Sequence, residues 1–431
     1  MPQLLIIADD FTGALDTGVQ FSKQGYLTSV TTVYPPDPSF FTGEADVLVA
    51  DTESRHLPAQ EAYARSFAWA RMAKEQGVRL IYKKTDSTLR GNVGIELKAA
   101  MDATQRKKIL FAPALPRLGR TVIQGEVFFQ GVPLARTVFA KDPFTPVGSS
   151  FVKDIIHASA PELCVAGTTP SGLLDCYYGE ENAEVLVVDA QTEGQMQEIA
   201  LSAYALRDQI ILAGCAGFAQ MIPAMLEKSY LPIPRKLRVE NCLFVSGSVN
   251  QIALDQIRYG QDLGIPTVLL QPQQLLQLDY WQTEEGEAEL AELSEMLREY
   301  RNLILNTANG EKDTAKVRKY ASIQGILPEE LHLRVADGLG RLTALLTEEN
   351  SVDLLCVFGG DTLYGILNHL QANKITPESE ILPGVVQSVF SCEQGERQVI
   401  SKAGGFGDRD LIQKILQCFG LSAPETAAKV I

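Results

Sequence analysis

Short apolar runs alternate with helix-like stretches along the chain, and this alternation limits the folds that it can adopt. In the first half the runs are LLIIA (4–8), DVLVAD (46–51), RLIYKK (79–84), KKILFAP, EVLVVDA and QIILAG. After each of the first three, the recurrence of apolar residues predicts a helix, over 12–24, 59–76 and 92–103. Continuous apolar strands that alternate with helices are typical of α/β folds, in which a mostly parallel sheet is flanked by helices on both faces.

The segment SYLPIPRKL (229–237) interrupts this pattern, and its two prolines and two basic residues are typical of a linker. Beyond it the alternation restarts with CLFVSGS (242–248) and continues to DLLCVFGGDT (353–362). Two domains are also the natural expectation for 431 residues. The sequence therefore predicts two α/β domains, residues 1–230 and 238–431. A poorly periodic segment rich in Pro and Gly, 111–146, predicts an irregular excursion or a small β-ribbon.

Composition excludes several classes of protein. A net charge of −15 argues against a general nucleic-acid binder, which needs a basic face. No run of eighteen apolar residues exists, so no membrane partner is expected, and MPQLLIIADD reads as a first core strand, not a signal peptide. The seven cysteines form no C-x-x-C pair, which predicts reduced thiols in the cytoplasm. Four scattered histidines argue against a structural zinc site.

Polar residues follow three predicted strands of the first domain. Asp9 and Asp10 follow the first strand, Asp51 to Arg55 follow the second, and KKTDSTLRGN (83–92) follows the third. In open parallel sheets, ligands bind beyond the carboxyl ends of the strands. The three segments together supply carboxylates, hydroxyls and cations, which is the mixture that a polyhydroxylated acid requires. A ligand site at this edge is therefore favoured.

Helix capping is the alternative interpretation of the same residues. Thr12 and Asn92 are candidate N-caps, and Asp10 is placed where an acid favours a helix N-terminus. For any one residue, capping is about as good an explanation as ligand binding. Because strand side chains alternate between faces, Lys83 and Lys84 are not expected to share a role, and Lys83 is predicted to be structural.

The second domain contains three glycine-rich turns, in FVSGSVN, VFGGDTLYG and SKAGGFGDRD. Glycine allows backbone N–H groups to approach phosphate oxygens, and a helix N-terminus carries positive potential. Two of the turns also place a hydroxyl beside glycine, at Ser248 and Thr362. Three such turns in one domain indicate a nucleotide site, whereas one alone is common in α/β loops.

Several known motifs are absent or altered. The chain has no G-x-x-x-x-G-K-[ST], no G-x-G-x-x-G after the first strand and no G-x-S-x-G elbow. The stretch ADDFTGA is close to the D-x-D-x-T motif of phosphatases that use an aspartate nucleophile. Its aspartates are adjacent, so the two carboxylates do not share one face of a strand, and that interpretation is rejected.

Taken together, IADDFTGALDTG, KKTDSTLRGN, FAPALPRLGRT, GGDT and KAGGFGD resemble the four-carbon acid sugar kinases, from residue 3 to about 415. The resemblance implies an ATP-dependent kinase that phosphorylates the terminal (4-) hydroxyl of D-threonate, D-erythronate or 3-oxo-tetronate. It also implies an N-terminal domain that binds the acid sugar, a C-terminal domain that binds ATP, and a cleft across which the two face each other. Mg²⁺ is expected to bridge phosphate oxygens with few protein ligands, and no residue is assigned to it.

Carried over by motif, the acid-sugar contacts are Asp10, Arg55, Lys84, Thr85, Asp86, Ser87 and Arg90. The ATP contacts are Ser248, Gly359, Gly360, Asp361, Thr362, Gly404 and Gly405. Either Asp10 or Asp86 is expected to accept the proton of the attacking hydroxyl. The chain departs from the family at Ala403, Leu363 and Cys215, where serine is frequent, so no hydroxyl contact is expected at these places.

Two other classes of protein are alternatives to the kinase. The alternative to the kinase is a non-catalytic cytoplasmic protein that binds a sugar acid and a nucleotide, and ATP-dependent turnover separates the two. A metal-dependent aldolase or hydratase would require a cluster of histidines and carboxylates that four scattered histidines do not offer. The sequence identifies neither the stereochemistry of the acid nor the oligomeric state, and it leaves a homo-oligomer open.

Overall fold

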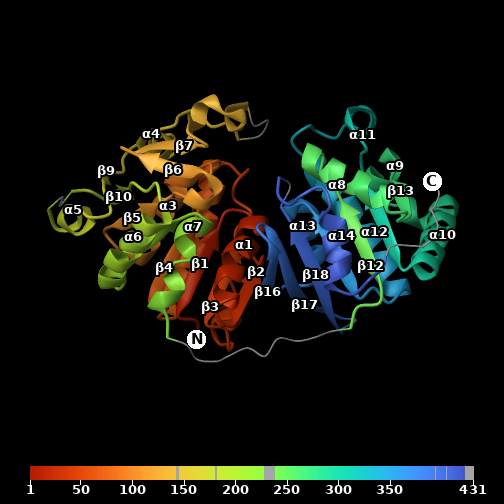
Figure 1. Ribbon diagram of the computed structural model, residues 1–431, viewed down its shortest axis with the longest axis horizontal. Helices are drawn as coiled ribbons and strands as arrows, with labels where there is room; N and C mark the ends of the chain where they lie inside the picture. Colours follow the sequence, from red (N-terminus) through yellow and green to blue (C-terminus); the bar gives the residue numbers. More distant parts are fainter. Residues whose placement is uncertain (142–144, 180–181, 228–237, 394, 404, 423–431) are drawn as a thin grey trace. The chain divides into compact units, whose positions relative to one another are not determined.

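The computed structural model describes the chain except for residues 142–144, 180–181, 228–237, 394, 404 and 423–431. It divides into two compact units, Met1–Pro232 and Ile233–Ile431, and each contains its own set of strands (Figure 1). The predicted linker at 229–237 lies outside the described residues. In the part of the chain that is described, no helix has both the length and the hydropathy of a membrane span.

The sheet of the first unit is parallel throughout the pairs described. Its strand order is β2-β3-β1-β4-β11-β5-β10-β9. The strands are β1 (Leu4–Ala8), β2 (Thr28–Thr31), β3 (Val47–Asp51), β4 (Leu80–Lys84), β5 (Ile109–Ala112), β9 (Val165–Thr168), β10 (Val185–Val188) and β11 (Ile211–Gly214). Most of their residues are buried, because helices cover both faces of the sheet and shield its apolar side chains from solvent.

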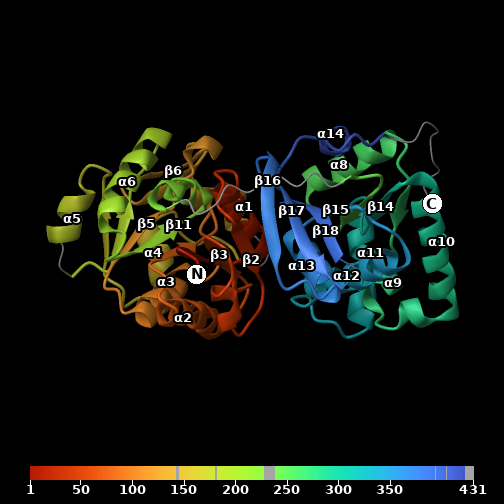
Figure 2. The same cartoon turned by 90° about the horizontal axis from the view of Figure 1, so that it is seen from below.

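The three helices predicted for this unit are present, each within two residues of its expected bounds. The helices of the unit are α1 (Phe11–Ser22), α2 (Ala59–Glu75), α3 (Val93–Thr104), α4 (Val152–His157), α5 (Leu173–Gly179), α6 (Glu193–Leu206) and α7 (Ala216–Ala219). Helices α2 and α3 pack together on one face of the sheet, and α1, α6 and α7 lie on the other (Figure 2). Trp69 of α2 is fully buried against the ring of Phe41, at 6.1 Å between centroids.

The segment 111–146 contains the predicted β-ribbon. It consists of β6 (Arg120–Ile123), β7 (Glu126–Phe129) and β8 (Val132–Pro133), which pair antiparallel. A bridge between Leu115 and Arg120 ties the start of the ribbon to the loop that follows β5. The ribbon is therefore fixed to the edge at which the parallel strands end.

The sheet of the second unit has the order β13-β14-β12-β15-β18-β17-β16. Its strands are β12 (Cys242–Ser246), β13 (Thr267–Leu269), β14 (Asn302–Asn306), β15 (Leu354–Phe358), β16 (Ile375–Leu382), β17 (Val385–Cys392) and β18 (Gly395–Lys402). The first part is parallel, but β16, β17 and β18 form an antiparallel meander. The sequence analysis missed this meander because its strands are only partly buried, so polar residues interrupt the apolar runs.

The helices of the second unit are α8 (Gln251–Asp262), α9 (Pro272–Leu276), α10 (Glu284–Tyr300), α11 (Glu311–Ile323), α12 (Leu331–Glu349), α13 (Gly360–His369) and α14 (Leu411–Cys418). Helices α12 and α13 approach each other backbone to backbone. A Cβ atom on Gly340 would lie 2.4 Å from the carbonyl oxygen of Gly365, and one on Gly365 would lie 2.4 Å from that of Ala336. Glycine at both positions therefore sets how α13 lies on α12.

Candidate active site

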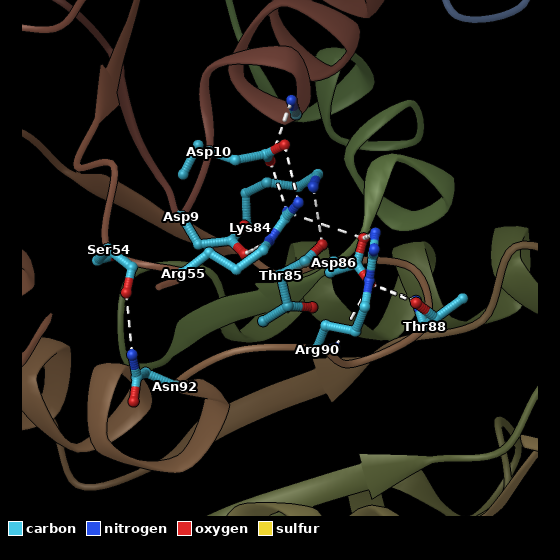
Figure 3. Close-up of polar contacts among 12 residues, drawn as sticks. Asp9, Asp10, Ser54, Arg55, Lys84, Thr85, Asp86, Thr88, Arg90 and Asn92 are labelled. Atoms are coloured by element: carbon cyan, nitrogen blue, oxygen red, sulfur yellow. Dashed lines mark hydrogen bonds and ion pairs between the residues drawn. The ribbon is translucent and has the colours of Figure 1, made fainter. Parts of the chain in front are cut away.

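Strands β3, β1 and β4 are neighbours in the first sheet and run in the same direction. Their carboxyl ends therefore meet at one edge, as predicted from the polar segments that follow them. Figure 3 shows the side chains that lie together at this edge. They are Asp9 and Asp10 after β1, Arg55 after β3, and residues from Lys84, the last of β4, to Arg90. Residues far apart in the sequence thus form one polar cluster.

Arg55 lies at the centre of this cluster. Its Nε lies 2.7 Å from Oδ2 of Asp9, and its two terminal nitrogens contact both oxygens of Asp10, at 2.6 and 2.9 Å. One of them also lies 3.8 Å from Oδ1 of Asp86. Burial alone would lower the pKa of Arg55, but the carboxylates of Asp10, Asp9 and Asp86 outweigh it and raise that pKa well above its usual value. Arg55 therefore joins the ends of three strands as a permanent cation.

Asp86 also pairs with a second guanidinium, that of Arg90. Arg90 contacts it in bidentate fashion, with Nε 2.8 Å from Oδ2 and a terminal nitrogen 3.1 Å from Oδ1. The backbone N–H of Thr88 donates to Oδ2 at 3.2 Å, and the hydroxyl of Thr88 also donates to it. Burial opposes ionisation of Asp86, but Arg55 and Arg90 outweigh it and hold its pKa well below the usual value. The same balance of burial against Arg55 lowers the pKa of Asp9.

Asp10 has two structural roles at once. It is the N-cap of α1, where its side chain accepts a hydrogen bond from the N–H of Gly13 at 3.1 Å, and it pairs with Arg55. The prediction of Thr12 as an N-cap is wrong, because Thr12 already lies inside the helix. Asn92 occupies the N-cap position of α3, but its side chain donates to the carbonyl oxygens of Ser54 and Leu57. It therefore holds the loop that carries Arg55.

The two lysines at the end of β4 have different surroundings, as predicted. Lys83 is fully buried, and its Nζ lies 3.0 Å from Oε2 of Glu96 on α3. It also donates to the carbonyl oxygen of Ile7, so it has a structural role. Lys84 is 4% exposed, and its Nζ donates to the carbonyl oxygen of Thr85 at 2.8 Å. No carboxylate among the described residues lies within ion-pairing distance of it.

The segment after β4 also contains a residue that the sequence analysis did not select. Ser87 is partly exposed and makes no polar contact that the structure records, whereas Thr88, which the sequence analysis did not select, makes two hydrogen bonds to Asp86. An aspartate that bonds to the N–H two residues on is a common turn pattern, and this signal was available in the sequence. The hydroxyl of Thr85 and Oδ1 of Asp9 are buried, and neither has a hydrogen-bond partner in the part of the chain that the structure describes. Both are polar atoms that a ligand can satisfy.

The second unit brings two of its glycine turns together. Strands β12 and β15 are parallel neighbours, so the turns that follow them lie side by side. Gly359 has φ +115°, a conformation that side chains rarely adopt, and a Cβ on Gly247 would lie 2.4 Å from the hydroxyl oxygen of Thr362. The hydroxyl of Thr362 therefore packs against the backbone of the first turn.

Gly360, Asp361 and Thr362 form the first turn of α13, and no side chain caps this helix. The first N–H groups of an uncapped helix point beyond its end and attract anions. Ser248 lies in the turn after β12, and its hydroxyl oxygen accepts the N–H of Asn250 at 3.4 Å. Gly405 is exposed after β18, and Gly404 lies outside the described residues. This edge is built mainly from backbone groups.

Both halves of the chain match known families. Residues 4–222 match the family described as a sugar-binding N-terminal domain, and residues 243–412 match a nucleotide-binding C-terminal domain. The sequence is 32% identical to a D-threonate kinase of Salmonella typhimurium, over 94% of this chain and 95% of that one. It is 27% identical to a D-erythronate kinase of Heliobacterium modesticaldum, over 95% of each chain.

A solved structure supports the fold. The crystal structure of a Haemophilus influenzae protein superimposes with a TM-score of 0.72 at 20% identity, over 96% of this chain and 100% of the other. The two-unit α/β architecture is therefore shared, and the match of the sequence families extends over both units.

Proposed function

The chain belongs to the four-carbon acid sugar kinases, and on that premise we propose that it transfers the γ-phosphoryl group of ATP to the terminal (4-) hydroxyl of a tetronate. D-threonate and D-erythronate are the substrates that we place first. Over nearly the whole chain, identity is 32% to the D-threonate kinase and 27% to the D-erythronate kinase, against 26% to a 3-oxo-tetronate kinase, which supports D-threonate most. The acid is assigned to the first unit and ATP to the second.

The observation that carries the proposal is the cluster at the ends of β1, β3 and β4. It combines fixed cations, ionised carboxylates and the buried hydroxyl of Thr85, whose oxygen has no hydrogen-bond partner among the described residues. Such a set offers donors and acceptors to the hydroxyls of an acid sugar and, in Lys84, a cation to its carboxylate. An apolar ligand or a simple anion would not require it.

Asp10 is the carboxylate that we favour as the proton acceptor. Its side chain is 23% exposed, whereas that of Asp86 is 11% exposed. Arg90 contacts both oxygens of Asp86 and, with Arg55, holds its pKa far below the usual range, which makes Asp86 a weak base. Asp86 then orients Arg90 and Thr88, while Asp10 faces the attacking hydroxyl.

The nucleotide is assigned to the turns at Gly247 and Gly359. The uncapped first turn of α13 supplies N–H groups for phosphate oxygens, and the hydroxyl of Thr362 lies beside them. Asp361 is exposed in the same turn, and its carboxylate would hold Mg²⁺ together with water. Bound Mg²⁺ would neutralise charge on the transferred phosphoryl group.

The test is a coupled ADP-release assay with Mg-ATP and a panel of D- and L-threonate, D- and L-erythronate and 3-oxo-tetronates. We expect strong turnover with one acid, and its loss on Arg90→Ala. Calorimetry with the same acids provides the second readout. Tight binding of an acid without ADP release from any of them would favour a non-catalytic binding protein and overturn the proposal.

A further inference from the structure

Arg120 is a further cation at the same edge of the first unit, although it does not directly follow any strand of the parallel sheet. It is the first residue of β6, and its backbone pairs with Leu115 in the loop after β5. Its guanidinium carbon lies 4.9 Å from the centre of the Phe129 ring on the neighbouring strand, and a terminal nitrogen donates to the carbonyl oxygen of Leu118 at 3.0 Å. The side chain is therefore held in place by the ribbon.

The guanidinium of Arg120 has unused hydrogen-bonding capacity. Its Nε is buried and has no hydrogen-bond partner, and no carboxylate of the described residues lies within ion-pairing distance of it. Asp86 and Asp16 are near enough to act on its charge, and burial lowers its pKa. A buried donor without a partner is costly unless something else satisfies it.

The topology brings Arg120 to the neighbourhood of Lys84. Strand β11 lies between β4 and β5, and Gly214 at its end pairs with Lys84 on one side and with Ala112 on the other. Cys215 follows Gly214, and its thiol contacts the carbonyl oxygens of Pro113 and Ala114 in the loop that leads to the ribbon. The charges of Lys84 and Arg120 both act on this buried thiol. The two cations therefore flank the end of β11.

The balance of charge separates these two cations from the others. In the cluster described above, Asp9, Asp10 and Asp86 carry three formal negative charges, against two positive charges on Arg55 and Arg90. These five residues are paired with one another, and their sum is negative, so a further carboxylate placed among them meets repulsion. Lys84 and Arg120 add two positive charges, and no carboxylate in the described part of the chain lies within ion-pairing distance of either. A single carboxylate bound to them would bring the formal charge of these seven residues to zero.

We propose that Lys84 and Arg120 together bind the carboxylate of the acid sugar, and that Arg120 determines the preference for an acid over a neutral polyol. This inference rests on the proposed function and makes it more specific. Arg55 and Arg90 then act by orienting Asp10 and Asp86 and do not bind the substrate carboxylate directly. The ribbon contributes a specificity residue to the site.

The experiment measures binding to the full-length protein by calorimetry without nucleotide, using the preferred tetronate and the corresponding tetronamide, in which a neutral amide replaces the carboxylate. Wild type is compared with Arg120→Gln, Arg120→Lys and the control Arg117→Gln. Arg117 is exposed three residues earlier, so its replacement removes the same charge outside the site. ADP release under saturating ATP gives KM and kcat for the same proteins.

We expect Arg120→Gln to weaken binding of the acid by roughly 10- to 100-fold, the range for a lost charge-assisted hydrogen bond, and binding of the amide by a few-fold at most. KM should rise more than kcat falls, Arg120→Lys should recover part of the affinity, and Arg117→Gln should resemble wild type. If Arg120→Gln does not fold, the wild-type ratio of acid to amide affinity and the Arg120→Lys variant decide the question.

Equal losses for acid and amide, or equal affinity of wild type for the two ligands, would overturn the assignment of Arg120. An enzyme that phosphorylates a tetronate while Arg120→Gln changes nothing would refute this inference alone. A wild-type protein that neither binds nor phosphorylates any tetronate would refute the proposed function, and this inference with it.

Discussion

The strand ends of the two units are built from different chemical groups. In the first unit the edge is built from charged side chains that contact one another, with Arg55 between Asp9 and Asp10. In the second unit the edge is built from glycine backbone and an uncapped helix, with the hydroxyl of Thr362 packed against Gly247. Side-chain sites select charge and shape, whereas backbone cradles hold any phosphate, so one unit is suited to selecting the acceptor and the other to holding the donor.

The two edges should therefore differ in the substitutions that they tolerate. The side-chain edge is sensitive to the loss of a single charge, because removing one member of an ion pair there leaves the other unpaired. The backbone edge tolerates changes of side chain and is sensitive to any added Cβ atom. The four predictions below run from the largest expected effect to the smallest.

Asp10→Asn should lower kcat by a factor on the order of 10²–10⁴, the usual contribution of a general base, and leave ATP affinity unchanged. Steady-state kinetics with the preferred tetronate measures it. Asp102→Asn is the control, because Asp102 is exposed on α3. Near-normal turnover in both Asp10→Asn and Asp86→Asn would rule out a carboxylate base from this cluster.

Lys83→Met should destabilise the first unit by about 3–5 kcal/mol, because it leaves the buried carboxylate of Glu96 without its partner. Urea unfolding followed by Trp69 fluorescence, with Trp281 replaced by Phe, reports on this unit, since the chain has only these two tryptophans. Lys98→Met removes an exposed pair with Asp102 and should cost under about 1 kcal/mol. Equal losses in the two variants would show that burial is not the deciding factor.

Gly359→Ala should strain the turn after β15 by about 1–3 kcal/mol, because Gly359 has a positive φ that alanine rarely adopts. We expect weaker ATP binding and unchanged tetronate binding, both measured by calorimetry. Gly310→Ala is the matched control, since a Cβ there meets no atom within 4 Å. Weakened tetronate binding instead would contradict the division of ligands between the units.

The stability of the two units should depend on pH in different ranges. The folded-state pKa of Asp86 is depressed, so its contribution is present above the unfolded value of about 3.9 and is lost as pH falls through the folded value. Burial lowers the pKa of Lys402 to about 8, so between pH 8 and about 10.4 the unfolded state binds more protons and stability rises with pH.

Unfolding at a series of pH values, followed by Trp69 in one single-tryptophan variant and by Trp281 in the other, measures both slopes. Asp86→Asn should flatten the acid limb of the first unit, and Lys402→Met should flatten the alkaline limb of the second. Slopes that persist in these variants would assign the pH dependence to other groups.

The sequence predicted the helices and strands that depend on the local order of apolar residues. It did not predict positions that depend on how distant segments pair. Apolar periodicity placed the helices α1 to α3 and the parallel strands, and the strand-end rule brought Asp10, Arg55 and Asp86 together. Thr12 was a wrong cap because Asp10, two residues earlier, is nearer to the free N–H groups of α1. Arg120 follows no parallel strand of the main sheet, and only the ribbon that folds back on the loop after β5 places it at this edge. The motif FAPALPRLGRT contains Arg120, but the sequence analysis assigned this residue no role.

The close approach of α12 and α13 has a consequence for how variation in this protein is interpreted. A Cβ atom on Gly340 or Gly365 would force the two backbones apart and displace α13, whose first turn is the proposed phosphate cradle. In a mutational scan selected on nucleotide affinity, both glycines would therefore be depleted as strongly as residues of the turn itself. Their sensitivity would reflect the position of a helix and not a contact with the nucleotide.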